Sequence, residues 1–141
     1  MTKILVDSNI LIYSLQKKEG KKHDLSAEFI NELIDSSNLT LSIQNLIEFS
    51  RVMSEKVFPS VDNDLIRQYV AEFSASASII YYNNHTVMDA LLISKQYEIH
   101  FFDALVVATM QENGVETIAT ENEKDFKKLP WLTVINPFKE K

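Results

Sequence analysis

Four carboxylate side chains stand just after a predicted strand or near the start of a predicted helix. They belong to Asp7, Glu48, Asp103 and Asp125. Three of them adjoin large apolar residues, where an unpaired carboxylate is costly. Two carboxylates about 4 Å apart repel each other by roughly 4 kcal/mol at an effective dielectric near 20, and a cation relieves that repulsion. These residue types therefore favour a site that holds positive ions.

The available donor atoms indicate which ion such a site would bind. The chain has no cysteine, which excludes zinc–thiolate sites, disulfides and cysteine nucleophiles. Its histidines, His23, His85 and His100, precede or open predicted helices and lack metal-binding spacing. Oxygen ligands alone favour Mg²⁺ or Mn²⁺ over zinc. We therefore expect one or two such ions.

Each carboxylate also has a structural interpretation. Asp7 could cap the helix that follows it, and Asp103 could interact with the helix dipole in a first turn. Asp125 could be a surface or capping residue. Glu48 lies inside a predicted helix between two large apolar residues, which neither role explains. A fifth acid in an apolar segment, Asp89, is interpreted as structural because its helix lies away from the predicted binding edge.

Predicted strands and helices alternate along the chain. The strands are expected at 3–6, 39–43, 79–82, 116–119 and 132–135, and the helices at 10–16, 24–37, 44–56, 62–76, 85–97 and 101–112, with a helical turn between the last two strands. This alternation predicts an α/β fold with a largely parallel sheet covered on both faces. In such sheets ligands bind at the carboxyl ends of the strands, where the four acids are expected to converge. We expect residues 1–141 to form a single domain.

Composition and charge narrow the range of functions. The chain is 45% hydrophobic, enough for a folded core, and its net charge of −6 disfavours passive binding of nucleic acid. Two divalent ions would bring that charge to −2 and place positive charge where a phosphate would lie. No apolar stretch approaches the ~20 residues of a membrane span, and Asp7 interrupts the first apolar run too early for a signal peptide. We expect a cytoplasmic protein without a membrane partner.

Four segments resemble motifs of the PIN-domain family, especially the VapC-like ribonuclease toxins. Residues 4–9 resemble the opening strand with its D-x-N ending, and residues 42–48 resemble the second strand and the helix that bears a glutamate. Residues 101–108 are similar to the third acidic motif, and residues 120–126 are similar to the final T-x-N-x-x-D-F segment. The order and spacing of these motifs cover almost the whole chain.

The resemblance implies a PIN-like three-layer fold and metal-dependent hydrolysis of RNA phosphodiesters. The implied metal ligands and catalytic residues are Asp7, Glu48, Asp103 and Asp125. Asn9, Thr120 and Asn122 would orient a ligand, water or phosphate. Asn122 stands where some members have aspartate, and its neutral oxygen would hold a second ion more weakly. For the toxin branch, the resemblance also implies a cognate antitoxin protein and a homodimer.

Two other function classes fit the same residues. A non-catalytic PIN-fold module would dock a protein or RNA without cutting it, and another carboxylate–Mg²⁺ enzyme, such as a phosphatase, would hydrolyse other phosphoesters. Metal binding and RNA cleavage distinguish these alternatives. The lysines that could hold RNA phosphates at the rim are Lys17, Lys18, Lys21, Lys22, Lys124, Lys127 and Lys128.

Overall fold

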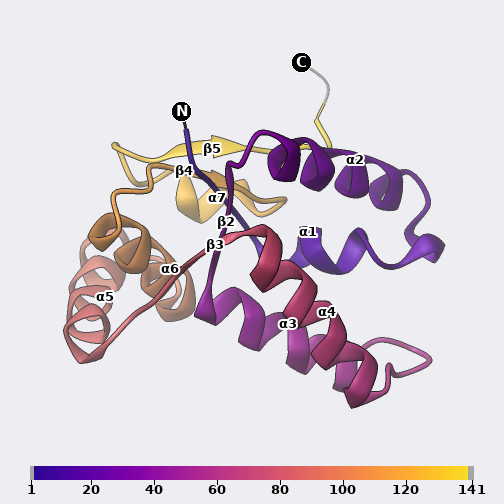
Figure 1. Ribbon diagram of the computed structural model, residues 1–141. Coiled ribbons are helices and arrows are strands. Elements are labelled where there is room, and N and C mark those ends of the chain that lie inside the picture. Colours follow the sequence, from indigo (N-terminus) through magenta and orange to yellow (C-terminus); the bar gives the residue numbers. More distant parts are fainter. Residues whose placement is uncertain (1, 140–141) are drawn as a thin grey trace.

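The computed structural model describes residues 2–139 and has one central parallel sheet (Figure 1). Its strands are β1 (Ile4–Val6), β2 (Leu39–Ser42), β3 (Ser78–Ile80), β4 (Thr117–Ala119) and β5 (Thr133–Ile135). They pair in the order β3-β2-β1-β4-β5, every neighbouring pair parallel. The predicted parallel α/β sheet is therefore confirmed. Because β1 is the middle strand, Asp7 leaves the sheet at its centre.

The helices form two groups (Figure 1). They are α1 (Ser8–Tyr13), the 3-10 helix η1 (Lys17–Glu19), α2 (Lys21–Asp35), α3 (Ile43–Glu55), α4 (Asn63–Ser76), α5 (Asn84–Tyr97), α6 (Phe101–Glu112) and α7 (Glu123–Phe126). Helix α5 packs beside α6, and α3 packs beside α4 and α1. No helix within residues 2–139 is both long enough and apolar enough to cross a membrane.

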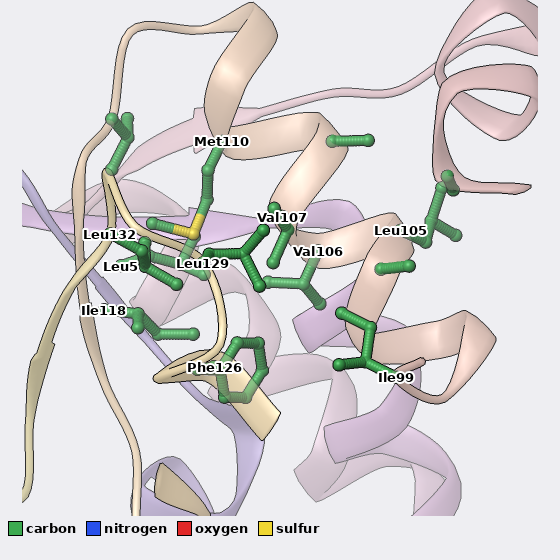
Figure 2. Close-up of a cluster of buried hydrophobic side chains, with 14 of the residues drawn as sticks. Leu5, Ile99, Leu105, Val106, Val107, Met110, Ile118, Phe126, Leu129 and Leu132 are labelled. Atoms are coloured by element: carbon green, nitrogen blue, oxygen red, sulfur yellow. The ribbon is translucent and has the colours of Figure 1, made fainter. Parts of the chain in front are cut away.

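Successive residues of the central strands point into two different cores. Leu5 and Ile118 pack with α5, α6 and α7, and Figure 2 shows side chains of α6 pointing toward them. Val6 and Ala119 pack instead with α1, α2, α3 and α4. Because side chains alternate between the two faces of a strand, these clusters lie on opposite sides of the sheet. Helices thus cover both faces, as the sequence predicts.

Local hydrogen bonds determine where the helix that carries Glu48 begins. Ser42, the last residue of β2, accepts a hydrogen bond at Oγ from the backbone N–H of Asn45 at 3.0 Å. The Asn45 side chain accepts one in return from the Ser42 backbone N–H, also at 3.0 Å. This reciprocal capping box turns β2 directly into α3. As a result, Glu48 lies in the second turn of α3, close to the sheet edge.

Two local expectations differ from the structure. The segment 17–22, predicted as a charged loop, contains η1 and the start of α2; Gly20, with φ of 61°, separates the two helices. Glycine adopts this left-handed conformation without a steric penalty, so a single residue suffices as the connection. Residues 39–43 alternate between apolar and polar types, yet all four residues of β2 are buried. Burial on both faces is expected when helices cover both sides of a parallel sheet.

Candidate active site

Three of the four predicted acids directly follow a strand or lie in the helix after it, and the fourth, Asp103, lies at the start of α6, which follows α5. Asp7 follows β1, Glu48 lies in α3, Asp103 in the first turn of α6 and Asp125 in α7. Burial, together with the negative charges of Asp7, Asp125 and Glu48, raises the pKa of Asp103 to about 6, although His100 acts to lower it. The structure therefore brings the four carboxylates into one electrostatic neighbourhood.

Asp7 is both a helix cap and a member of this acidic group. Its Oδ1 accepts a hydrogen bond from the Ser8 backbone N–H at 2.8 Å, which caps α1, and its Oδ2 accepts one from the Thr120 hydroxyl, also at 2.8 Å. Burial raises the pKa of Asp7, and Glu48 adds to that effect, while the hydrogen bonds from Thr120 and Ser8 oppose it. The two interpretations of Asp7 are thus compatible: the contacts that cap α1 also orient the carboxylate.

Glu48 is held by two residues that sequence reasoning missed. The Ser8 hydroxyl donates to Glu48 Oε2 at 3.1 Å, and Gln44 Nε2 donates to Glu48 Oε1 at 3.3 Å. Ser8 and Gln44 are both buried. The helical i, i+4 spacing of Gln44 and Glu48 was a signal for the second contact. No comparable signal linked Ser8 to a glutamate 40 positions away.

The acidic residues in the segment after β4 have different partners. Thr120 is fully buried; its hydroxyl donates to Asp7 and accepts a hydrogen bond from the Asn122 backbone N–H at 3.1 Å. Glu121 binds the Tyr13 hydroxyl and Lys22, and Glu123 forms ion pairs with Lys127 and Lys139. These contacts lower the pKa values of both glutamates. Asp125 is the acid of this segment whose charge acts on Asp103.

The remaining candidates lie at the surface. Asn9, in the first turn of α1, is exposed, and so is Asn122, whose side chain does not cap α7. Asp89 is exposed on α5, so the apolar setting inferred from its neighbours is wrong. Met88, Leu91 and Leu92 beside it are also exposed, because this face of α5 points away from the core.

Several of the lysines expected to hold phosphates are already paired. Lys22 binds Glu121, Lys127 binds Glu123, and Lys128 lies 3.7 Å from an oxygen of Asp125. An ion-paired lysine offers less net attraction to a phosphate than a free one does. The rim of the acidic group is thus less cationic than the lysine count implies.

The donor atoms of the acidic group suit a hard divalent cation. They are carboxylate oxygens, the ligands that Mg²⁺ and Mn²⁺ prefer, and burial together with their mutual repulsion raises the pKa of Asp103. Within residues 2–139, however, no three acidic or histidine side chains lie close enough together to enclose an ion. The chemistry of the donor set fits the implied metal, whereas binding would require the side chains to draw together.

Comparisons with known proteins agree with this architecture. The PIN-domain family model matches residues 4–132. No curated protein matches the sequence. Among solved structures, FitAB bound to an IR36 DNA fragment contains a chain that is 18% identical, with a TM-score of 0.77 over 98% of this chain and 97% of that one.

Two further structures share the fold. A toxin–antitoxin complex from Klebsiella pneumoniae contains a chain that is 21% identical, with a TM-score of 0.68 over 98% of this chain and 100% of that one. Mycobacterium tuberculosis VapC20, a sarcin–ricin loop cleaving toxin, is 16% identical, with a TM-score of 0.60 over 82% of this chain and 87% of that one. At these identities the likeness establishes the fold.

Proposed function

Because this chain belongs to the PIN-domain family, we propose that it is a divalent-metal-dependent endoribonuclease and the toxin of a toxin–antitoxin pair. The observation that carries the proposal is that Ser8 donates hydrogen bonds to both Asp7 and Glu48 and so joins them, beside the partly buried Asp103 on which their charges act. Carboxylates that repel one another in a partly buried site gain most from binding a cation. That cation, in turn, supplies the positive charge that an RNA phosphate needs in an acidic protein.

The proposed ligands of one or two Mg²⁺ or Mn²⁺ ions are Asp7, Glu48, Asp103 and Asp125. A bound ion would lower the pKa of a coordinated water and polarise the phosphoryl group. Asp125 belongs to a helix of four residues, and beside it Asn122 offers a neutral amide oxygen. The second ion, if bound on this side, would therefore be held more weakly than the first.

The surrounding residues fix the orientation of these acids. Thr120 and Ser8 hold Asp7, while Ser8 and Gln44 hold Glu48. In the metal-free protein the pKa of Asp103 is raised to about 6, and a bound cation would lower it again and keep the carboxylate ionised as a ligand. At the surface, Asn9 and Asn122 would orient a water or a phosphate oxygen.

The partners belong to the same proposal. The similar Klebsiella pneumoniae structure is a toxin–antitoxin complex, which supports a cognate antitoxin for this chain. Met88, Leu91 and Leu92 form an exposed apolar stripe with i, i+3, i+4 spacing on α5, which supports a homodimer. A cytoplasmic location fits both the RNA substrate and the absence of cysteine.

RNA cleavage with Mg²⁺ or Mn²⁺, compared with EDTA, tests the enzymatic part of the proposal. We expect Asp7→Asn and Asp103→Asn to abolish cleavage while the fold, followed by circular dichroism, persists. Asp89→Asn, an exposed acid on α5, is the matched control and should retain activity. Full cleavage by both site variants would refute the assignment. Co-purification with the product of a neighbouring gene tests the toxin role.

A non-catalytic PIN-fold module is the second candidate. The observation that favours it is that no three acidic or histidine side chains within the described chain enclose an ion. Calorimetric titration with Mn²⁺ separates the two candidates. Binding at micromolar to submillimolar concentration supports the nuclease, and no binding at millimolar concentration supports the module.

A further inference from the structure

An exposed aromatic pair lies next to the acidic group. The rings of His100 and Phe102 stack with their centroids 5.9 Å apart and their planes inclined by 29°. Phe102 is 54% exposed although it is a large apolar residue, and His100 is exposed as well. Phe101 packs edge-on against Phe102 at 5.5 Å and itself contacts the core beneath α6. Phe101 therefore connects the exposed pair to the core.

Two contacts place this pair beside the acids. The carbonyl oxygen of Phe102 accepts a hydrogen bond at 2.8 Å from Gln44, the same amide group that donates to Glu48. Phe102 also precedes Asp103 directly in the first turn of α6, and His100 is close enough to influence the ionisation of Asp103. A planar group stacked on the pair would thus lie next to the proposed reaction centre.

Because the protein is acidic, a stacking surface would contribute RNA affinity that its net charge does not supply. The chain carries a net charge of −6, and Lys22, Lys127 and Lys128 are occupied by ion pairs with acidic side chains. Attraction between these three lysines and RNA phosphates is therefore reduced. Stacking between a base and an aromatic ring does not depend on net charge, and every base offers a planar face for it.

We propose that His100 and Phe102 form a base-stacking subsite that holds an unpaired base of single-stranded RNA beside the acidic group. The inference rests on the proposed ribonuclease function and assigns His100 and Phe102 as residues that position its substrate. Bases within a duplex are covered on both faces by their neighbours, whereas unstacked bases of loops and single strands are free to stack on aromatic side chains. The subsite thus selects unpaired RNA and tolerates different bases.

The test measures binding of a short single-stranded RNA that contains 2-aminopurine, with Ca²⁺ replacing Mg²⁺ to prevent turnover. Phe102→Leu keeps an apolar side chain but removes the ring, and we expect it to weaken binding about tenfold and to reduce the fluorescence change. Phe102→Trp restores a ring and should bind within about twofold of the wild type. In cleavage assays with Mg²⁺, Phe102→Leu should raise KM and leave kcat unchanged, because stacking acts on substrate binding.

Phe58→Leu is the matched control. Phe58 is 84% exposed but lies beyond the C-terminal end of α3, whereas Glu48 lies in the second turn of that helix. The control should leave RNA affinity unchanged. The subsite is refuted by equal binding of Phe102→Leu and wild type, or by a loss that tryptophan does not restore.

Sedimentation analysis of the same variants tests the competing explanation that this surface is a dimer interface. A Phe102→Leu protein that loses affinity because a dimer has dissociated would assign this surface to a second copy of the chain and would refute the subsite. A wild-type protein that neither binds nor cuts RNA would instead refute the proposed function itself. The two failures are therefore distinguishable.

Discussion

Gln44 donates a hydrogen bond from Nε2 to the carbonyl oxygen of Phe102 at 2.8 Å and thereby joins α3 to the first turn of α6. The same Nε2 donates to Glu48 Oε1 at 3.3 Å. Both partners are acceptors, so the amide must present its NH₂ group to them. Gln44 Oε1 is left buried without a partner among the described residues. One buried side chain thus connects the helix of Glu48 with the helix of Asp103.

Replacing Gln44 by methionine should weaken metal binding more than it weakens the fold. The substitution keeps an unbranched side chain of similar length, and the lost hydrogen bonds are partly offset by removal of the unpaired oxygen. We expect a stability loss of at most about 1 kcal/mol, against a roughly tenfold or greater rise in the Kd for Mn²⁺ measured by calorimetry. Thr109→Val, which removes a buried hydrogen bond from Thr109 to the Leu105 carbonyl within α6, is the control. Thr109→Val should lower stability without changing the Kd; equal effects of both variants would contradict the positioning role of Gln44.

Asp103→Asn should stabilise the metal-free protein at neutral pH. The folded-state pKa of Asp103 is about 6, above its ordinary value of 3.8, so the folded protein binds this proton more tightly than the unfolded chain does. The ionised group therefore destabilises the fold above pH 6, and this effect fades as the pH falls toward 4. We expect a gain of about 1 kcal/mol at pH 7.5, less than the full shift implies because the carboxyl group remains partly exposed.

Urea unfolding of wild type and Asp103→Asn at pH 7.5 and pH 4 measures this difference. The gain should be present at the higher pH and nearly absent at the lower one. A variant that is less stable than wild type at pH 7.5 would show that the Asp103 carboxylate stabilises the fold rather than straining it.

Thr120→Val should disturb Asp7 specifically. The Thr120 hydroxyl is fully buried and donates to Asp7 Oδ2 at 2.8 Å, a contact that lowers the pKa of Asp7. Its loss leaves a buried carboxylate oxygen with one donor fewer, which should cost about 1–3 kcal/mol of stability. It should also raise the pKa of Asp7, so that Mn²⁺ binding begins at a higher pH. Thr117→Val, at the buried start of β4, is the comparison and should leave the pH dependence of Mn²⁺ binding unchanged.

Metal binding should stabilise the protein in a pH-dependent manner. At a free Mn²⁺ concentration of 100 times Kd, the expected gain is about 2.7 kcal/mol, observed as a higher melting temperature. Protons compete with the ion for the carboxylates, and burial raises the pKa values of both Asp7 and Asp103. The stabilisation should therefore diminish as the pH falls through about 6. A Mn²⁺-induced shift of the melting temperature that is equal at pH 8 and pH 5 would point to an ion bound elsewhere.

The sequence was informative where function depends on residue type and chain order. The alternation of predicted strands with predicted helices indicated the parallel sheet, and the positions of Asp7, Glu48, Asp103 and Asp125 just past strand ends or near helix starts predicted that they share one edge of it. A rule about strand ends places residues within one region, but it does not specify hydrogen bonds. Neither the donor for each carboxylate nor the burial of each group follows from such a rule.

The contacts that escaped prediction are those that join distant segments. Ser8 reaches Glu48 across 40 residues and Gln44 reaches Phe102 across 58 residues, so neither pairing has a local signature. The same holds for Glu121, whose partners Tyr13 and Lys22 lie about 100 residues earlier in the chain. Only the folded arrangement shows that Glu121 binds Tyr13 and Lys22, whereas the charge of Asp125 acts on Asp103.

The central position of β1 has a consequence for the rigidity of the backbone that carries the acidic group. The Asp7 backbone N–H donates to the Ala119 carbonyl at 3.0 Å, between the middle strand and its neighbour, with a buried core on each side. Its hydrogen exchange should therefore require global unfolding. Asp125 lies on the four-residue helix α7, where the next residue, Phe126, is fully buried in the same core as Leu5 and Ile118. Opening α7 alone would expose the Phe126 ring to water, so the Asp125 side of the acidic group should also stay closed until the core itself unfolds.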